Sequence, residues 1–358
     1  MSADNPRSDA LLPVRNLWNS VKCSRDRVRD GEPNESSGAF SLSNFWEIMN
    51  EAVNSVSQEA TKLSVMFSKP PLPSEEGCVK IAQSVQKSVL TLTTVYFWLP
   101  KSQGVTLRKL LRDATAQVLD DLAQLLQALL SSPGGSLSQE QLMSTGGVWA
   151  ACDRFNQLPK DNRSAVLSVL ASCVGLVKDA LEEMEQALAE AQDPFGDVLD
   201  DDDEDDDEGN QDTHWSEADR LLIAQCQGLM KASGASLRRL CSAVRNNSTL
   251  ETEENITQLD DLADAAREIS PSVDDLALSL YPPVERSAVE MSVSLYRSLL
   301  RHAGTRDEFR RAPRSLDQSQ HDVICHSVMN GITRTRCGFY RCGRSLVTKN
   351  RCVKWCVC

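Results

Sequence analysis

The chain has 358 residues, with 38 Lys plus Arg against 51 Asp plus Glu, and 41% of its residues are hydrophobic. These amounts suit one large or two ordinary soluble domains with a sizeable buried core. No 18 apolar residues run together, and the polar N-terminus lacks the apolar stretch of a secretory signal, so we expect an intracellular protein. Aromatic residues make up only 5%, and β-branched runs between regular turns are missing, which favours an all-α fold.

The charge is distributed unevenly along the chain. Residues 301–358 contain 12 Lys plus Arg and 4 Asp plus Glu, a net charge of +8, which leaves the first 300 residues with a net charge of −21. Binding to phosphate backbones needs a basic face, so this acidic body disfavours direct contact with nucleic acid. Basic protein partners suit it better.

Four amphipathic stripes predict helices of about six turns each. Their apolar positions recur at spacings of three and four residues, which is the period of one helix face. The stripes cover residues 45–67, 107–129, 166–188 and 222–244. Pro70, Pro71 and Pro73 end the first of these helices, and Ser74 caps a further helix that runs to Pro100. Long striped helices with short breaks are typical of an up-and-down bundle.

Caps and breaks define the remaining helices. Gly104 opens the helix of the second stripe, and Ser138 with Gln141 predicts a capping box for a helix that runs toward Leu158. Near residue 270 the sequence predicts a short, sharply bounded helix. Ser270 is a suitable N-cap there, and Pro271 fits the first helical position, where its missing N–H costs nothing.

An acidic run divides the chain into two helical halves. Residues 200–208 are nine consecutive carboxylates, which repel one another and cannot bury apolar area, so we expect a disordered linker. The predicted parts are a partly helical N-terminal segment (1–40), an N-terminal helical bundle (41–192), the acidic linker (193–213), a C-terminal helical lobe (214–291) and a disordered Arg/Cys-rich tail (292–358).

The sequence carries no recognisable catalytic motif. Phosphate loops, GxGxxG turns after a strand, GxSxG elbows and HExxH helices are all missing, so we predict no enzymatic activity, no catalytic residue, no cofactor and no metal. The six scattered cysteines are predicted to be reduced core thiols. The Cys-rich end suggests a zinc site, but its spacings depart from two tight ligand pairs, which favours an unstructured tail. Its candidate ligands are His326, Cys337, Cys342, Cys352, Cys356 and Cys358.

Short motifs suggest partner docking and modification without identifying a binding residue. Arg238-Arg239-Leu240 and Arg108-Lys109-Leu110 have the Arg-x-Leu pattern that docks on cyclin grooves, but the Leu of each falls on a buried stripe. Ser132 and Ser270 each precede Pro, as proline-directed kinases require. Phosphorylation at these two positions stays open.

An ordered set of segments carries a family resemblance. The segments cover residues 45–53, 57–61, 72–74, 99–110 and 269–283, and the acidic run lies among them in its expected place. Together they resemble the cyclin-D-binding protein family, also called Grap- and cyclin-D-interacting protein or Id-like maternal helix-loop-helix protein. After Met291 the sequence departs from the family pattern, as an alternative exon or a shifted reading frame would produce, which would leave the C-terminal lobe incomplete.

The resemblance implies a two-lobed, all-helical interaction protein without catalytic activity. Such a protein binds D-type cyclins, restrains phosphorylation of the retinoblastoma protein and negatively regulates cell-cycle progression. It also binds helix-loop-helix transcription factors and signalling adaptor proteins, contacts neither nucleic acid nor membrane directly, and occurs in cytoplasm and nucleus.

Two alternatives to the cyclin regulator stay open. Long helices of this kind also resemble vinculin- and talin-type bundles, which predicts a helical adaptor in signalling or cytoskeletal attachment. The second alternative is a metal-dependent activity in the Cys-rich tail.

Overall fold

A computed structural model describes residues 11–31, 40–131, 138–191 and 215–294 of the chain. Within these ranges every regular element is a helix and no strand is found, which confirms the predicted all-α class. The predicted acidic linker (193–213) lies outside the described residues, as does most of the predicted tail.

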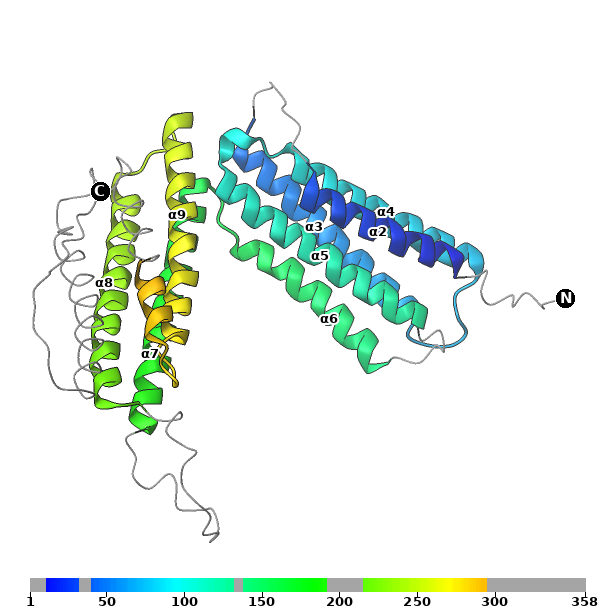
Figure 1. The fold of residues 1–358 in the computed structure, drawn as a ribbon. Coiled ribbons are helices and arrows are strands. Elements are labelled where there is room, and N and C mark those ends of the chain that lie inside the picture. The colour runs from blue at the N-terminus through cyan, green and yellow to red at the C-terminus, as the bar shows by residue number, and fades with distance from the viewer. Residues whose placement is uncertain (1–10, 32–39, 132–137, 192–214, 295–358) are drawn as a thin grey trace, which may run out of the picture. The chain divides into compact units, whose positions relative to one another are not determined.

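The first helices of the described chain form a bundle in which neighbours lie side by side (Figure 1). α2 packs against α4 and α5, α3 packs against α4 and α6, and α5 also packs against α6. The order around the bundle is therefore α2, α5, α6, α3, α4. These helices are α2 (Leu12–Asp30), α3 (Leu42–Met66), α4 (Glu75–Trp98), α5 (Val105–Ser131) and α6 (Gln139–Arg154).

The predicted stripes form the core of this bundle. Leu63, Leu92, Val118 and Leu122 are completely buried, each from a helix face whose apolar positions recur every three or four residues. The predicted N-cap of α4 is also confirmed, because the Ser74 hydroxyl accepts a hydrogen bond from the Gly77 amide at 3.2 Å. Local caps and apolar periodicity therefore explain where these helices begin and which faces they bury.

The chain divides into two compact units. The first contains residues 1–169 and 243–264, and the second contains residues 170–242 and 265–358. Three helices therefore each contribute residues to both units: α7 (Asn162–Glu190), α8 (Glu217–Asn247) and α9 (Glu253–Leu278). The first unit thus includes residues from before and after the acidic run.

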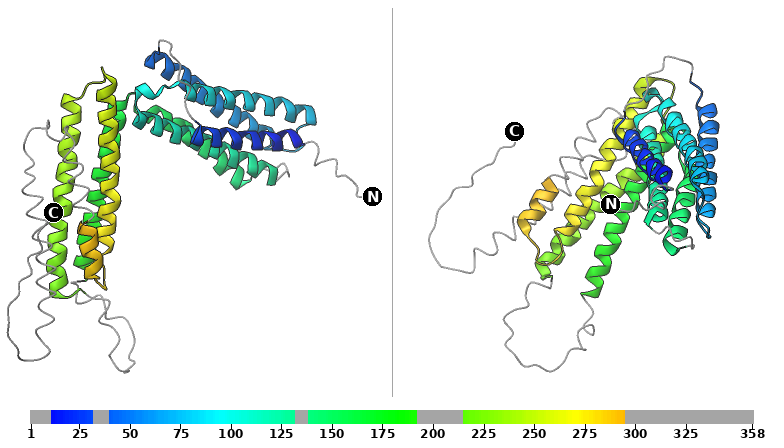
Figure 2. Two further views of the ribbon diagram at one scale, coloured as in Figure 1. Left: turned by 45° about the horizontal axis from the view of Figure 1, so that its top comes forward. Right: turned by 90° about the vertical axis from the view of Figure 1, so that its right-hand side faces the viewer.

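The second unit is built from long helices that lie side by side (Figure 2). It contains the greater parts of α7, α8 and α9, and a helical segment at residues 286–294. Among the described residues, α7 is the helix long and apolar enough to match a membrane span, but core helices of soluble proteins share these properties. The side chains of Leu170, Val177 and Met184 on this helix are buried among protein.

The predicted helix break near residue 270 is wrong. Helix α9 runs without interruption from Glu253 to Leu278 and includes Pro271 in its interior. The apolar stripe continues across the proline, because buried residues recur at spacings of four and three on both sides of it. They are Leu262, Ala266, Ile269, Val273, Leu276 and Leu280. Burial of this continuous face outweighs the local cost of the proline and the capping signal of the Ser-Pro pair.

The predicted capping box at the start of α6 is half correct. The Ser138 hydroxyl accepts from the Gln141 amide at 3.1 Å, as an N-cap should. The Gln141 side chain instead donates to the Ser64 carbonyl on α3 at 2.8 Å. A buried amide in contact with a neighbouring helix finds its partner there rather than at its own helix end.

Candidate protein-interaction groove on the N-terminal bundle

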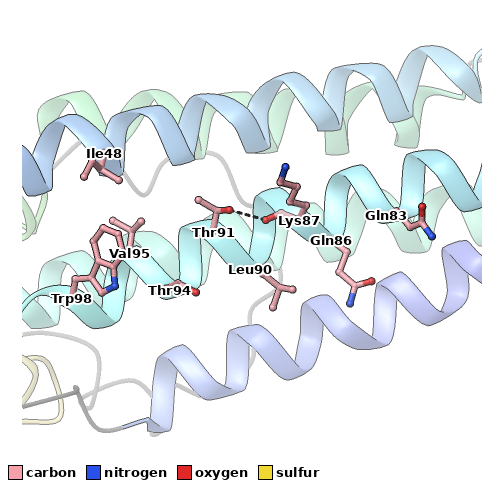
Figure 3. Close-up of a pocket in the computed structure, with 9 residues that line it drawn as sticks. All are labelled: Ile48, Gln83, Gln86, Lys87, Leu90, Thr91, Thr94, Val95 and Trp98. Carbon is pink, nitrogen blue, oxygen red and sulfur yellow. Dashed lines mark hydrogen bonds between the residues drawn. The ribbon is translucent and has the colours of Figure 1, made fainter.

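A groove follows the outer face of α4, the helix that packs between α2 and α3. Its volume is about 470 Å³, and it is open to solvent along its length. Figure 3 shows Ile48 on α3 facing the end of α4 that carries Val95 and Trp98. The other lining residues all belong to α4: Gln83, Gln86, Lys87, Leu90, Thr91 and Thr94.

Two large apolar side chains in this groove are exposed. Leu90 is 48% exposed and Trp98 is 46% exposed, while Val89 and Leu92 on the opposite face of α4 are buried in the core. The core-facing residues hold the helix in place, so the groove is presented on a rigid support. Exposed aromatic and aliphatic side chains on such a support are typical of protein-binding surfaces.

The spacing of the lining residues suits a helical partner. Gln83, Lys87, Leu90, Thr94 and Trp98 follow one another at three or four residues, so they form one stripe of α4 about 22 Å long. An amphipathic helix of about four turns would cover such a stripe, with its apolar side chains against Leu90 and Trp98.

The groove presents one charged side chain to a partner. The Thr91 hydroxyl donates to the Lys87 carbonyl at 2.9 Å, as the dashed line in Figure 3 marks, so that hydroxyl is already satisfied within the helix. Lys87 is the one charged residue among the lining side chains. An acidic residue on the partner would therefore find its counter-charge one turn from the Gln83 end of the stripe.

A second groove on the same bundle has a different character. It lies between α5 and α6 with a volume of about 570 Å³, and most of the residues that line it are polar. The residues are Gln124, Gln127, Gln139, Glu140, Met143, Ser144 and Gly147. Because it presents several amides and one carboxylate but no aromatic side chain, it offers less apolar area to a partner than the α4 groove.

The bundle also carries exposed apolar residues outside both grooves. Leu142 is 51% exposed and Trp149 is 44% exposed, values close to those of Leu90 and Trp98. The Trp149 indole donates to the Thr61 hydroxyl on α3 at 2.9 Å. These two residues on α6 therefore provide matched references for any function assigned to the α4 groove.

The groove ends at a corner where α4 turns into α5. Leu99 is completely buried, and its carbonyl accepts a hydrogen bond from the Arg108 guanidinium. The same guanidinium lies 5.4 Å from the centre of the Tyr96 ring. Burial raises the pKa of the Tyr96 hydroxyl, and the positive charge of Arg108 opposes that rise. Arg108 therefore ties the first turn of α5 to the last turn of α4.

The start of α5 is capped by a residue far away in the sequence. The Asp260 carboxylate on α9 accepts from the backbone amides of Val105 at 2.7 Å and Thr106 at 2.8 Å. Asn162 completes the network, because its amide donates to Asp260 at 3.0 Å and its carbonyl oxygen accepts from the Leu107 amide at 3.0 Å. The orphan donors of this helix end are thus satisfied by two side chains from other helices.

The corner depends on a glycine that no other residue can replace without strain. Gly104 has φ +106°, and a Cβ atom there would lie 2.0 Å from Cγ of Asn162. The sequence pattern predicted only that Gly104 opens a helix. It gave no signal for Asp260 or Asn162, because neither is near residue 104 in the chain.

The Arg-x-Leu motifs are held in the fold and are not presented to a partner. Arg108 is buried at the corner, and Lys109 pairs with Asp264 at 3.0 Å. In the other motif Leu240 is buried. A docking peptide must offer both its Arg and its Leu, so neither motif is available in this structure.

The remaining predicted site residues are partly within the described chain. The zinc candidates His326, Cys337, Cys342, Cys352, Cys356 and Cys358 and the phosphorylation candidate Ser132 lie outside the described residues. Ser270 falls within helix α9. In the ranges that the structure describes, no group of three or more His, Cys, Asp or Glu side chains is arranged to hold a metal ion.

Four of the six described cysteines match the predicted core thiols, while Cys241 is only half-buried. Cys78, Cys152, Cys173 and Cys226 are buried, but Cys23 on α2 is exposed. Burial raises the pKa of the Cys152 thiol to about 12, so this thiol stays protonated and unreactive at neutral pH.

Comparison with known proteins matches two family models to most of this chain. Residues 48–190 match the model described as Grap2 and cyclin-D-interacting, N-terminal, and residues 199–303 match its C-terminal counterpart. The second match includes residues 292–303, which the sequence pattern assigned to the divergent tail.

Curated relatives are similar over most of their own length. The chain is 74% identical over 302 residues to the Cyclin-D1-binding protein 1 homolog of Danio rerio, which covers 84% of this chain and 88% of the relative. It is 48% identical over 291 residues to the Xenopus laevis homolog, covering 81% and 87%. It is 40% identical over 305 residues to Cyclin-D1-binding protein 1 of Homo sapiens, covering 82% and 84%.

Proposed function

Because the chain belongs to the Grap2 and cyclin-D-interacting family, we propose that it is a non-enzymatic regulator that binds a D-type cyclin through the α4 groove. The occupant that this groove fits is an amphipathic helix of the cyclin, with apolar side chains against Leu90 and Trp98 and an acidic residue against Lys87. The family supports the choice of a D-type cyclin as partner, and the exposed apolar stripe supports the choice of the α4 groove as its binding site.

The observation that carries the assignment is the pair of large apolar side chains in one exposed stripe. Leu90 and Trp98 are eight residues apart on the same face of α4 and line one groove. Exposed side chains of this size gain free energy when a partner removes them from water, at about 25 cal/mol per Å² of apolar area. The polar groove between α5 and α6 lacks such a pair.

The proposed consequence of binding is negative regulation of the cell cycle. A cyclin held by this protein would be less available to its kinase, so phosphorylation of the retinoblastoma protein would fall. Helix-loop-helix transcription factors and signalling adaptors are proposed as further partners, in cytoplasm and nucleus. A helix-loop-helix segment is itself amphipathic, so the same groove suits it by the same chemistry.

Calorimetric titration of a purified D-type cyclin into the full chain tests the groove. Leu90→Glu and Trp98→Ala should each weaken binding by about fivefold or more, because loss of a central apolar contact costs more than about 1 kcal/mol. The matched controls Leu142→Glu and Trp149→Ala change residues of similar exposure on α6 and should bind as the unchanged chain does. Circular dichroism would confirm that all four variants remain helical.

The opposite pattern would overturn the assignment. If the α6 variants weaken binding and the α4 variants do not, the cyclin binds another face of the bundle. If the unchanged chain does not bind any D-type cyclin, the proposed partner is wrong. A competition titration with a helix-loop-helix domain then tests the shared groove, since displacement of the cyclin is expected only if both partners occupy it.

A further inference from the structure

The corner beside the groove is fixed by a residue from the C-terminal family domain. We propose that Asp260 is a positioning residue for the α4 groove, through which residues 243–264 control partner binding on the N-terminal bundle. This inference rests on the function proposed above, because it concerns the regulation of the same groove. Asp260 does not line the groove, so its effect must pass through the corner between α4 and α5.

The first step of the connection is the cap of α5. The Asp260 carboxylate accepts three N–H groups, from Val105, Thr106 and the Asn162 side chain, at 2.7 to 3.0 Å. Thr106 and Asn162 are each only 1% exposed, so water cannot replace the carboxylate without rearrangement of the corner. The carboxylate also lies at a helix N-terminus, where negative charge is favoured.

The second step runs from α5 back to the groove. Arg108 belongs to the first turn of α5, and its guanidinium holds the carbonyl of Leu99. Leu99 directly follows Trp98, the apolar side chain at the end of the groove. Loss of the cap would loosen the first turn of α5, so Arg108 would no longer fix Leu99, and the end of α4 that carries Trp98 would move.

The third observation is that the segment between α4 and α5 is too short and too constrained to absorb a displacement. Only Pro100, the short helix Lys101–Gln103 and Gly104 separate Leu99 from Val105. Gly104 lies directly against Asn162, where no Cβ atom fits. A displacement at Asp260 or Asn162 is therefore transmitted along the chain to Leu99 and Trp98.

A set of three variants in the full chain tests this role. Asp260→Ala removes the cap, and Asp264→Ala is the matched control, because Asp264 lies one turn later on α9, is exposed and pairs with Lys109 at 3.0 Å. Leu122→Ala, in the core of the bundle, serves as a control for reduced stability alone. Cyclin affinity is measured by calorimetry at a temperature at which every variant is folded, and backbone hydrogen exchange is measured by mass spectrometry.

The expected results distinguish a displaced end of α4 from a general loss of stability of the bundle. Asp260→Ala should weaken cyclin binding by about tenfold and speed exchange over residues 98–108, the size of effect usual for coupled sites. Asp264→Ala should change neither quantity. Leu122→Ala should lower the melting temperature but leave the cyclin affinity unchanged.

Two results would overturn the inference, and they differ from failure of the proposed function. If Asp260→Ala speeds exchange only over residues 105–108 and leaves residues 98–99 unchanged, the cap does not reach the groove. If Asp260→Ala binds cyclin with unchanged affinity while Leu90→Glu weakens binding, the groove is used but is not positioned by Asp260. If Leu90→Glu also binds with unchanged affinity, the groove assignment itself is wrong, and the exchange over residues 98–99 still decides whether Asp260 positions Trp98.

Discussion

The body of the N-terminal bundle and its α4–α5 corner are stabilised in different ways. In the body, many apolar side chains from five helices share one core, so each contact is one among many. At the corner, a few polar atoms of Asp260, Asn162 and Arg108 satisfy specific backbone groups, and each has a single geometry. The body is therefore expected to tolerate small substitutions better than the corner does. A substitution that leaves a large cavity in the body should lower the free energy of unfolding most.

The largest expected effect comes from a cavity in the body. Leu122→Ala removes a completely buried side chain and should lower the free energy of unfolding by about 3 to 4 kcal/mol. Leu142→Ala, at an exposed position on α6, should change it by less than about 0.5 kcal/mol. Urea unfolding followed by circular dichroism measures both. Equal losses for the two variants would show that the core around Leu122 is not closely packed.

The next largest effect is expected at the corner glycine. Gly104→Ala places a side chain at φ +106° and against Asn162, which should lower the free energy of unfolding by about 3 kcal/mol. Gly146→Ala, inside helix α6 and facing open space, should raise it by about 0.5 to 1 kcal/mol. Thermal unfolding measures the two shifts. A loss at residue 146 as large as that at 104 would mean that backbone geometry does not distinguish the two regions.

Removal of the Asp260 cap should lower the free energy of unfolding somewhat less than the change at Gly104. Asp260→Ala leaves the amides of Val105 and Thr106 without their acceptor and should lower the free energy of unfolding by about 2 kcal/mol. Asp264→Ala breaks an exposed ion pair and should cost less than about 1 kcal/mol. Denaturant unfolding of both variants tests the difference, and it would disappear if Asp260 were no more than a surface charge.

The body could be predicted from the sequence because its signal is local. An apolar stripe repeats every three or four residues, so buried positions such as Leu63 and Leu122 follow from periodicity alone. The start of α4 was equally clear, because Ser74 and the acidic residues after it act within one turn. Interactions between residues that are close in the chain produce patterns that are visible within a short stretch of sequence.

The corner and the groove could not be predicted in the same way. Asp260 and the amides that it caps are separated by about 155 positions, so no local pattern joins them. The groove depends on which positions of α4 the neighbouring helices leave uncovered, and the sequence alone does not show that Leu90 and Trp98 line one groove. Helix α9 shows the opposite error, since a strong local signal at Ser270 and Pro271 predicted an end that tertiary packing overrides.

The smallest expected effect contrasts two buried carboxylates, one in each region. Asp260 at the corner and Asp121 in the body are both 8% exposed, but Asp260 accepts three N–H groups while Asp121 accepts one, from Gln117 at 2.9 Å. Burial raises the pKa of Asp121, an effect that the Gln117 hydrogen bond and the nearby Arg154 charge oppose and the Asp120 charge reinforces. The Asp121 carboxylate is therefore less well stabilised in the fold than in water.

The sign of the pH dependence follows from this raised pKa. Above the ordinary value of 3.8 the folded chain holds the Asp121 proton more tightly than the unfolded chain, so this residue makes stability fall as pH rises through the folded pKa. Asp121→Asn should remove that contribution, which makes the variant slightly more stable than the unchanged chain at pH 7, with a smaller difference near pH 4. Asp120→Asn, one residue earlier, should instead lose up to about 1 kcal/mol, because Asp120 pairs with Arg25 at 3.0 Å. Unfolding free energies of both variants at pH 4 and pH 7 test this contrast, and a loss of stability in Asp121→Asn at pH 7 would mean that its single hydrogen bond outweighs its burial.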